Sequence, residues 1–185
     1  DVTPRIVSNT MKDGLGQNII IDNKPGAGTI VGMQALLATK PDGYTIATAD
    51  SGTLAYNPSL YGKLPYDIEK NFVYIGGLAR MPLVLVTREG LGVKSLAELL
   101  ALARKEQGKL TYASAGAGSP HHVAMEMFQQ ETKTKLAHVP YKGAAPAVQD
   151  LLSGQVDLMM LDMPGGIAHP SHGLAAAGLQ LLEHL

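Results

Sequence analysis

One stretch decides the fold: residues 109–128, which read KLTYASAGAGSPHHVAMEMF. The stretch begins with a β-prone run over 110–113 and continues in a loop of small residues. Apolar residues at helical spacing follow at Val123, Met127 and Phe128. The pattern predicts a strand, a tight turn and the start of a helix.

The start of this helix has the features of an anion site. Ser119 fits the N-cap, and Pro120 fits the first helical position, where its missing N–H costs nothing. Glycines such as Gly118 let the backbone approach a bound group, and the first-turn N–H groups lie at the positive end of the helix dipole. A loop between a strand and a helix can also be rich in glycine only to turn the chain. Taken alone, the loop leaves both interpretations open.

The composition is typical of a globular α/β protein. The 185 residues are 45% hydrophobic and 17% charged, and the chain is long enough to bury a core. No apolar run approaches the roughly 20 residues that a membrane helix needs. Fifteen basic and sixteen acidic residues, without a basic cluster, give no signature of nucleic-acid or membrane-surface binding. We therefore expect no nucleic-acid partner.

Metal and thiol chemistry are not indicated either. The chain has no cysteine, which excludes disulfides, thiolate metal sites and cysteine nucleophiles. Of the six histidines, His121 and His122 are adjacent and would diverge on a helix, while Pro170 interrupts the helix that His169 and His172 would need to share a face. We expect no metal and no other cofactor.

Strands and helices alternate along the chain. Apolar runs and turn signals predict helices over 1–13, 31–38, 95–108 and 147–152, and strands over 19–21, 44–49, 72–78, 83–87, 110–113, 136–139 and 156–161. Alternation of this kind implies parallel βαβ units, in which ligands bind outside the carboxyl ends of the strands. Four loops lie at such ends: 50–53, 114–119, 141–143 and 162–165.

A set of motifs in one order resembles a known family. They are PGAG at 25–28, PDGYT at 41–45, NP at 57–58, LPYD at 64–67, SAGAGSPHH at 114–122, HVPYKGAAPA at 138–147 and DLLSGQVDLM at 150–159. Together they resemble the Bug family, the extracytoplasmic solute-binding components of bacterial tripartite tricarboxylate transporters. The match covers about residues 1 to 165.

The resemblance implies a fold and a function. The expected fold is α/β, a two-lobed periplasmic-binding-protein-like (type II) architecture with mainly parallel sheets, divided into lobe 1 at 1–87 and lobe 2 at 88–185. The expected function is capture of a small carboxylated solute, not catalysis, and the expected partners are that carboxylate ligand and the membrane subunits of the transporter. The expected location is the periplasm, although the chain shows no signal peptide.

The resemblance also implies that the chain is incomplete at both ends. The family's first strand and glycine-rich loop would precede Asp1, so lobe 1 is expected to lack its first strand. After Pro164 the family pattern dissolves, so the end of lobe 2 is expected to be divergent or incomplete.

The strand ends and the resemblance together indicate the ligand contacts. The expected ligand-binding residues are Ser51, Gly52 and Thr53 in the first lobe, and Ser114, Ala115, Gly118, Ser119, His122, Tyr141 and Asp162 in the second. Other roles remain open for several of them. Ser51 or Thr53 can cap the helix that follows, Tyr141 can pack inside, and Asp162 can cap another helix.

Two alternative functions were weighed. A Ser/His hydrolase would use Ser119 as nucleophile, with His122 or His138 as base. The nucleophile elbow requires Gly-x-Ser-x-Gly, however, and here Pro120 and His121 follow the serine. Ser119 and His122 at spacing i, i+3 instead predict a helix cap with a neighbour on the same face. The other alternative is a ligand-sensing module.

Overall fold

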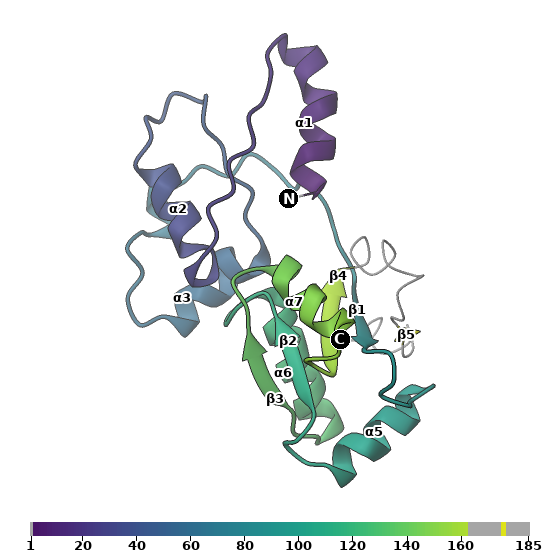
Figure 1. Ribbon diagram of the computed structural model, residues 1–185. Coiled ribbons are helices and arrows are strands. Elements are labelled where there is room, and N and C mark those ends of the chain that lie inside the picture. Colours follow the sequence, from purple (N-terminus) through teal and green to yellow (C-terminus); the bar gives the residue numbers. More distant parts are fainter. Residues whose placement is uncertain (1, 163–174, 177–185) are drawn as a thin grey trace.

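The computed structural model describes residues 2–162 and 175–176 (Figure 1). The helices are α1 (Val2–Leu15), η1 (Ala27–Thr29), α2 (Ile30–Leu37), η2 (Gly52–Tyr56), α3 (Asn57–Leu60), α4 (Ile68–Asn71), α5 (Leu96–Lys105), α6 (Pro120–Thr132) and α7 (Ala144–Leu152). The strands are β1 (Leu83–Thr87), β2 (Thr111–Ser114), β3 (Ala137–Pro140), β4 (Leu158–Asp162) and β5 (Ala175–Ala176). Helices α1 to α3 gather at one end of the molecule, and the sheet lies with α5 to α7 at the other (Figure 1).

One mixed sheet organises the second half of the chain. Its strand order is β3-β2-β4-β1-β5. Strand β2 is parallel to β3 and to β4, as expected of strands joined through helices, while β1 is antiparallel to both β4 and β5. The predicted βαβ units are therefore confirmed for β2, β3 and β4, and their carboxyl ends lie at the same edge of the sheet.

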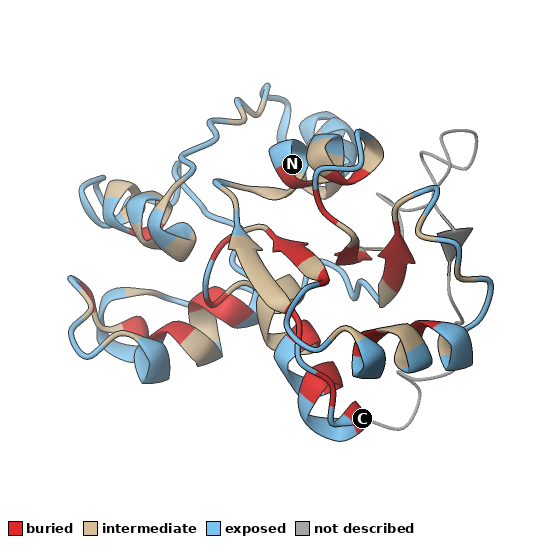
Figure 2. Cartoon of the chain, turned by 60° about the horizontal axis from the view of Figure 1, so that its bottom comes forward, coloured by how far each residue is buried: buried red, intermediate tan, exposed pale blue. Residues whose placement is uncertain are grey.

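Alternation along the strands divides the core between the two faces of the sheet. Tyr112 and Leu158 pack with Met125 and Phe128 of α6 on one face. On the other face, Ala113 and Met159 pack with Ala147 and Leu151 of α7, among other residues. Buried residues accordingly concentrate on the strands and on the sides of the helices that meet them (Figure 2). The period of two is what lets one strand supply both cores.

Serine side chains cap two helices, and the one at Ser119 was predicted. The Ser95 hydroxyl accepts a hydrogen bond from the Glu98 N–H at 3.2 Å at the start of α5. The Glu98 carboxylate accepts from the Lys94 N–H at 2.7 Å, one residue before the position of the standard capping box. At the start of α6, the Ser119 hydroxyl accepts from the His122 N–H at 3.3 Å, and Pro120 occupies the first helical position.

Three predicted strands are wrong. The stretches 19–21, 44–49 and 72–78 have no regular secondary structure and form no ladder with any strand that the structure describes. Several of their apolar side chains lie in solvent: Ile20 is 90% exposed, Tyr44 92% and Val73 91%. Propensity for β structure does not create a strand without a neighbour to accept its backbone hydrogen bonds.

The first half of the chain has a small core of its own. Met33 of α2 packs with Tyr66 and Ile68 at the start of α4, and the Tyr66 and Phe72 rings meet edge to face at 5.7 Å. The predicted helices over 1–13 and 31–38 correspond to α1 and α2. The predicted loop beyond Asp162 and the histidines at 169 and 172 lie outside the described residues. The division into lobes at residue 87 stays a prediction.

Candidate functional site

The candidate site is the loop between β2 and α6, residues 114–119, here called the carboxylate loop after the ligand that the sequence resemblance implies. Ser114 ends β2 and is fully buried, and Asp162 ends the neighbouring strand β4. The loop then passes through Gly116 and Gly118, both at positive φ, to the Ser119 cap. The edge of the sheet where ligands bind in open α/β folds is therefore the edge that carries this loop.

Loops from the first half of the chain contact the carboxylate loop. A Cβ atom added to Gly52 would lie 2.7 Å from the Gly118 carbonyl oxygen, closer than real contacts allow. A Cβ on Gly28 would lie 3.1 Å from the Ala117 carbonyl oxygen. Segments far apart in sequence thus meet backbone to backbone, and the absence of side chains at Gly28 and Gly52 permits it.

The first-half loops are held together by buried polar groups. The Thr53 hydroxyl is 2.9 Å from Asp50 Oδ1 and 2.6 Å from the Thr29 hydroxyl, and the Thr53 N–H donates to the same Asp50 oxygen at 2.8 Å. With Thr53 only 1% exposed, its hydroxyl is committed to these protein partners. Ser51, in contrast, is exposed, and Gly52 is buried against the carboxylate loop.

Asn57 is a residue that the sequence reasoning missed. Its amide nitrogen donates to the Gly28 carbonyl at 2.7 Å, and its side-chain oxygen would lie 3.1 Å from a Cβ on Gly118. Asn57 is fully buried and therefore links the Gly28 turn to the carboxylate loop. The Asn-Pro motif at 57–58 carried the family resemblance, and it was the signal that could have revealed this residue.

Two histidines form hydrogen bonds with the carboxylate loop. The Gly118 N–H donates to His122 Nδ1 at 3.1 Å. Ser114 Oγ accepts from the Gly116 N–H at 3.2 Å and lies 2.7 Å from His138 Nε2. Ser114 and His122 were both expected to contact ligand. In the structure, both side chains accept hydrogen bonds from backbone N–H groups of the carboxylate loop. His138 lies opposite Tyr112 in the β2–β3 register, so the parallel pairing could have placed it here.

The rings behind the loop form a stack with one carboxylate. The His122 and His138 ring centroids are 4.2 Å apart, those of Tyr112 and His138 are 4.7 Å apart, and all three rings are nearly parallel. Burial raises the pKa of Tyr112. The hydrogen bond that the Tyr112 hydroxyl donates to Glu126 raises this pKa further. Burial, and then the charge of His122, lowers the pKa of His138. The stack therefore favours the neutral form of His138.

The third predicted loop is joined to the carboxylate loop through the backbone. The Tyr141 N–H donates to the Ser114 carbonyl at 3.0 Å, and the Gly143 N–H donates to the Ala115 carbonyl at 3.2 Å. The Tyr141 hydroxyl points elsewhere and donates to Asp150 at 2.7 Å. Burial and the Asp150 carboxylate raise the Tyr141 pKa to about 12.

Asp162 and His121 lie together at the carboxyl end of β4. His121 Nε2 is 3.8 Å from Asp162 Oδ1, and His121 Nδ1 is buried without a hydrogen-bond partner in the described part of the chain. Within residues 2–162 and 175–176, nothing accepts a hydrogen bond from the N–H groups of Ala117 or His121. Ala117 is exposed, so its N–H, which precedes the positive end of α6, is available to an anion.

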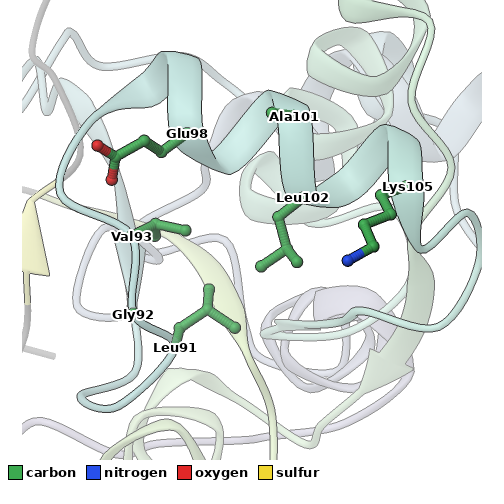
Figure 3. A pocket seen from close by; sticks show the side chains of 7 residues that line it. All are labelled: Leu91, Gly92, Val93, Glu98, Ala101, Leu102 and Lys105. Carbon is green, nitrogen blue, oxygen red and sulfur yellow. The ribbon is translucent and has the colours of Figure 1, made fainter.

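Hollows on the surface lie away from this site. One, of about 400 Å³, lies between α5 and the loop at 91–93, where Leu91, Val93 and Leu102 meet between Glu98 and Lys105 (Figure 3). Another, of about 330 Å³, follows α1 around Lys12 and Gln17. Neither is lined by the carboxylate loop, because the first-half loops are packed directly onto it.

The described residues contain no group of three or more His, Cys, Asp or Glu side chains placed to hold a metal ion. None of their helices is both long enough and apolar enough to cross a membrane.

Comparison with known proteins gives a consistent result. The family model described as "Tripartite tricarboxylate transporter family receptor" matches residues 3–177. Protein BugT of Bordetella pertussis is 36% identical over 174 residues, which are 94% of this chain and 53% of BugT. The chain spans about half the length of the curated relatives it matches.

Solved structures agree with the sequence relatives. An R. palustris protein solved with adipate superposes with a TM-score of 0.92 at 28% identity, over 96% of this chain and 60% of that one. MatC from Rhodopseudomonas palustris, solved with bound malate, superposes with a TM-score of 0.86 at 30% identity, over 95% of this chain and 60% of that one.

Proposed function

The chain belongs to the tripartite tricarboxylate transporter receptor family, and we propose that it binds a small dicarboxylate at the carboxylate loop. One observation carries the proposal: glycine loops from distant parts of the sequence meet at the start of α6, where the Ala117 and His121 N–H groups have no acceptor among the described residues. A carboxylate is the natural occupant of such a helix start.

The ligands of two structural neighbours indicate the class of ligand that we propose. One structural neighbour is solved with adipate and another with malate, and both carry two carboxylates on a short carbon chain. In the proposed complex, one carboxylate binds the α6 start, and Ser51, Ser119 and Asp162 line the remainder of the site. His121 lies beside Asp162 and supplies a buried nitrogen for a ligand hydroxyl or carboxylate.

Binding requires the site to open. The first-half loops contact the carboxylate loop closely, since a Cβ on Gly52 would lie 2.7 Å from the Gly118 carbonyl oxygen. A ligand therefore enters when the first-half loops around Gly28 and Gly52 move away from the carboxylate loop, and it is enclosed when they return. The closed form would then be presented in the periplasm to the membrane subunits of a tripartite transporter.

A thermal-shift screen of the protein tests this function. Adipate and malate should raise the melting temperature in a concentration-dependent manner, because a ligand that binds only the native state stabilises it by mass action. Adipamide is the matched control, since it keeps the carbon chain of adipate and removes both charges. An equal shift with adipamide, or no shift with any carboxylate, would contradict the proposal.

A further inference from the structure

We propose that neutral His122 is a positioning residue for the carboxylate loop: its unprotonated Nδ1 holds the Gly118 N–H, so protonation of His122 releases the loop and weakens ligand binding. This inference rests on the proposed function and specifies how the same site is regulated. It assigns no direct ligand contact to His122.

The geometry restricts which form of His122 can act. The Gly118 N–H donates to His122 Nδ1 at 3.1 Å, and a nitrogen that already carries a proton cannot accept this bond. Gly118 is buried and has a φ of 79°, in the left-handed region. Without this acceptor, the buried Gly118 N–H would lose the one partner it has among the described residues, which is costly enough to displace the loop.

The charged and titratable neighbours of His122 come from three elements. On α6, Glu126 Oε1 lies 3.9 Å from His122 Nε2, so it favours a proton on that nitrogen and leaves Nδ1 bare. From β2, Tyr112 donates its hydroxyl to the same carboxylate. From β3, the His138 ring stacks 4.2 Å away and opposes a second positive charge.

Two further acidic groups near the loop are already engaged. Asp162, at the end of β4, faces His121 at 3.8 Å. In the first half of the chain, Asp50 accepts hydrogen bonds from the backbone and side chain of Thr53. In the described structure the Gly118 N–H donates to His122 and to neither of these carboxylates.

His138 differs from His122 in its response to a proton. Its Nε2 is bonded to Ser114 Oγ, and a hydroxyl can either donate to a bare nitrogen or accept from a protonated one. Ser114 can accept from the Gly116 N–H in both cases. The bonds from Ser114 to His138 and Gly116 therefore survive protonation of His138. The bond from the Gly118 N–H to His122 does not survive protonation of His122 Nδ1.

Two substitutions at His122 distinguish the contribution of its hydrogen-bond acceptor from that of its stacked ring. His122→Asn keeps an acceptor, Oδ1, at the position of Nδ1 and does not titrate. His122→Phe keeps a stacking ring and removes the acceptor. At about pH 8, we expect adipate or malate affinity close to that of wild type for His122→Asn, and roughly 5- to 10-fold weaker for His122→Phe, the worth of one hydrogen bond.

The dependence of ligand affinity on pH distinguishes this role from a purely structural one, which would leave that dependence unchanged. Measured at pH values that leave both ligand carboxylates ionised, wild-type affinity should fall as the pH is lowered and His122 gains a proton. His122→Asn should remove this fall. His138→Gln, which keeps a neutral amide near Ser114, should retain it. A pH profile unchanged by His122→Asn, or lost in His138→Gln alone, would overturn the proposal.

An NMR measurement without ligand keeps this test separate from the proposed function. The Gly118 amide resonance should shift with pH at the same midpoint as the His122 ring nitrogens, and this shift should be absent in His122→Asn. Independence of Gly118 from the His122 titration would refute the inference, even if dicarboxylates bind. Absence of dicarboxylate binding with Gly118 and His122 still coupled would refute only the proposed function.

Discussion

At the scale of single residues, Ser119 tests whether the helix start is an anion site. Its hydroxyl caps α6 through the His122 N–H, so Ser119→Ala should lower the free energy of unfolding by about 1 kcal/mol. Ser119→Asp keeps a capping oxygen and adds a negative charge where the carboxylate would bind. We expect Ser119→Asp to retain wild-type stability and to lose adipate binding by calorimetry. Retained binding would place the ligand elsewhere.

Gly52 tests the contact between the two halves of the chain. An added Cβ would lie 2.7 Å from the Gly118 carbonyl oxygen, so the Gly52→Ala change forces one backbone to move. We expect a loss of about 1–3 kcal/mol in chemical denaturation, together with weaker ligand binding. Gly76→Ala is the matched control, because nothing lies within 4 Å of its Cβ. Equal stability of the two variants would show that the loops do not need this close contact.

The candidate site shows which residue roles could be predicted. The helix cap at Ser119 is local, since donor and acceptor are three residues apart, and the sequence pattern was sufficient to identify it. Thr53 and Tyr141 were expected to contact ligand, but their hydroxyls bond to Thr29 and Asp50 and to Asp150. A hydroxyl pattern reveals capacity for hydrogen bonding, and only the tertiary structure decides the partner.

At the scale of elements, β1 to β4 were all predicted, and for β2, β3 and β4 the pairing also follows from the order of the chain. Strands β2, β3 and β4 are joined by single helices, and short βαβ units bring such strands together. The stretches at 19–21 and 72–78 have the same apolar character but no paired strand among the described residues. Strand pairing is a non-local property, which explains why the same pattern led to a correct prediction in one half and a wrong one in the other.

Asp157 connects three strand ends through one carboxylate. It accepts from Arg88 Nε, just after β1, at 2.8 Å, and from the N–H and hydroxyl of Thr111 on β2 at 2.8 and 3.0 Å. Burial opposes ionisation of Asp157, but these hydrogen bonds outweigh it and lower the Asp157 pKa. A carboxyl whose pKa is lower when folded stabilises the protein above its unfolded pKa, and that stability is lost as the pH falls toward the lower value.

We therefore expect unfolding stability to decline below about pH 4 in the wild type, with part of that decline due to Asp157. Asp157→Asn should lower stability at neutral pH by about 2 kcal/mol, the scale of hydrogen bonds to a charged group, and should flatten the acid decline. Asp22→Asn is the control, since Asp22 forms an exposed pair with Lys24. Denaturation curves at several pH values give the answer, and identical acid declines in the wild type and Asp157→Asn would contradict it.

At the scale of the whole molecule, apolar surface is unevenly distributed. The sheet of the second half is covered by α6 on one face and α7 on the other. The unpaired stretches of the first half leave Ile20, Val73 and Ile75 at least 81% exposed. Unpaired backbone with apolar side chains is a template for strand pairing with another chain.

The described surface therefore predicts self-association through residues 72–78 when these 185 residues are studied alone. The double substitution Val73→Lys and Ile75→Lys should reduce association, because it replaces apolar contacts with like charges that repel between copies. Gln107→Lys with Gln130→Lys adds the same charge at exposed positions on the other half of the chain, so it controls for net charge alone. Sedimentation velocity over a range of concentrations measures the result. If the wild type stayed monomeric, or if the control pair dispersed it equally well, the exposed segment would not be the site of association.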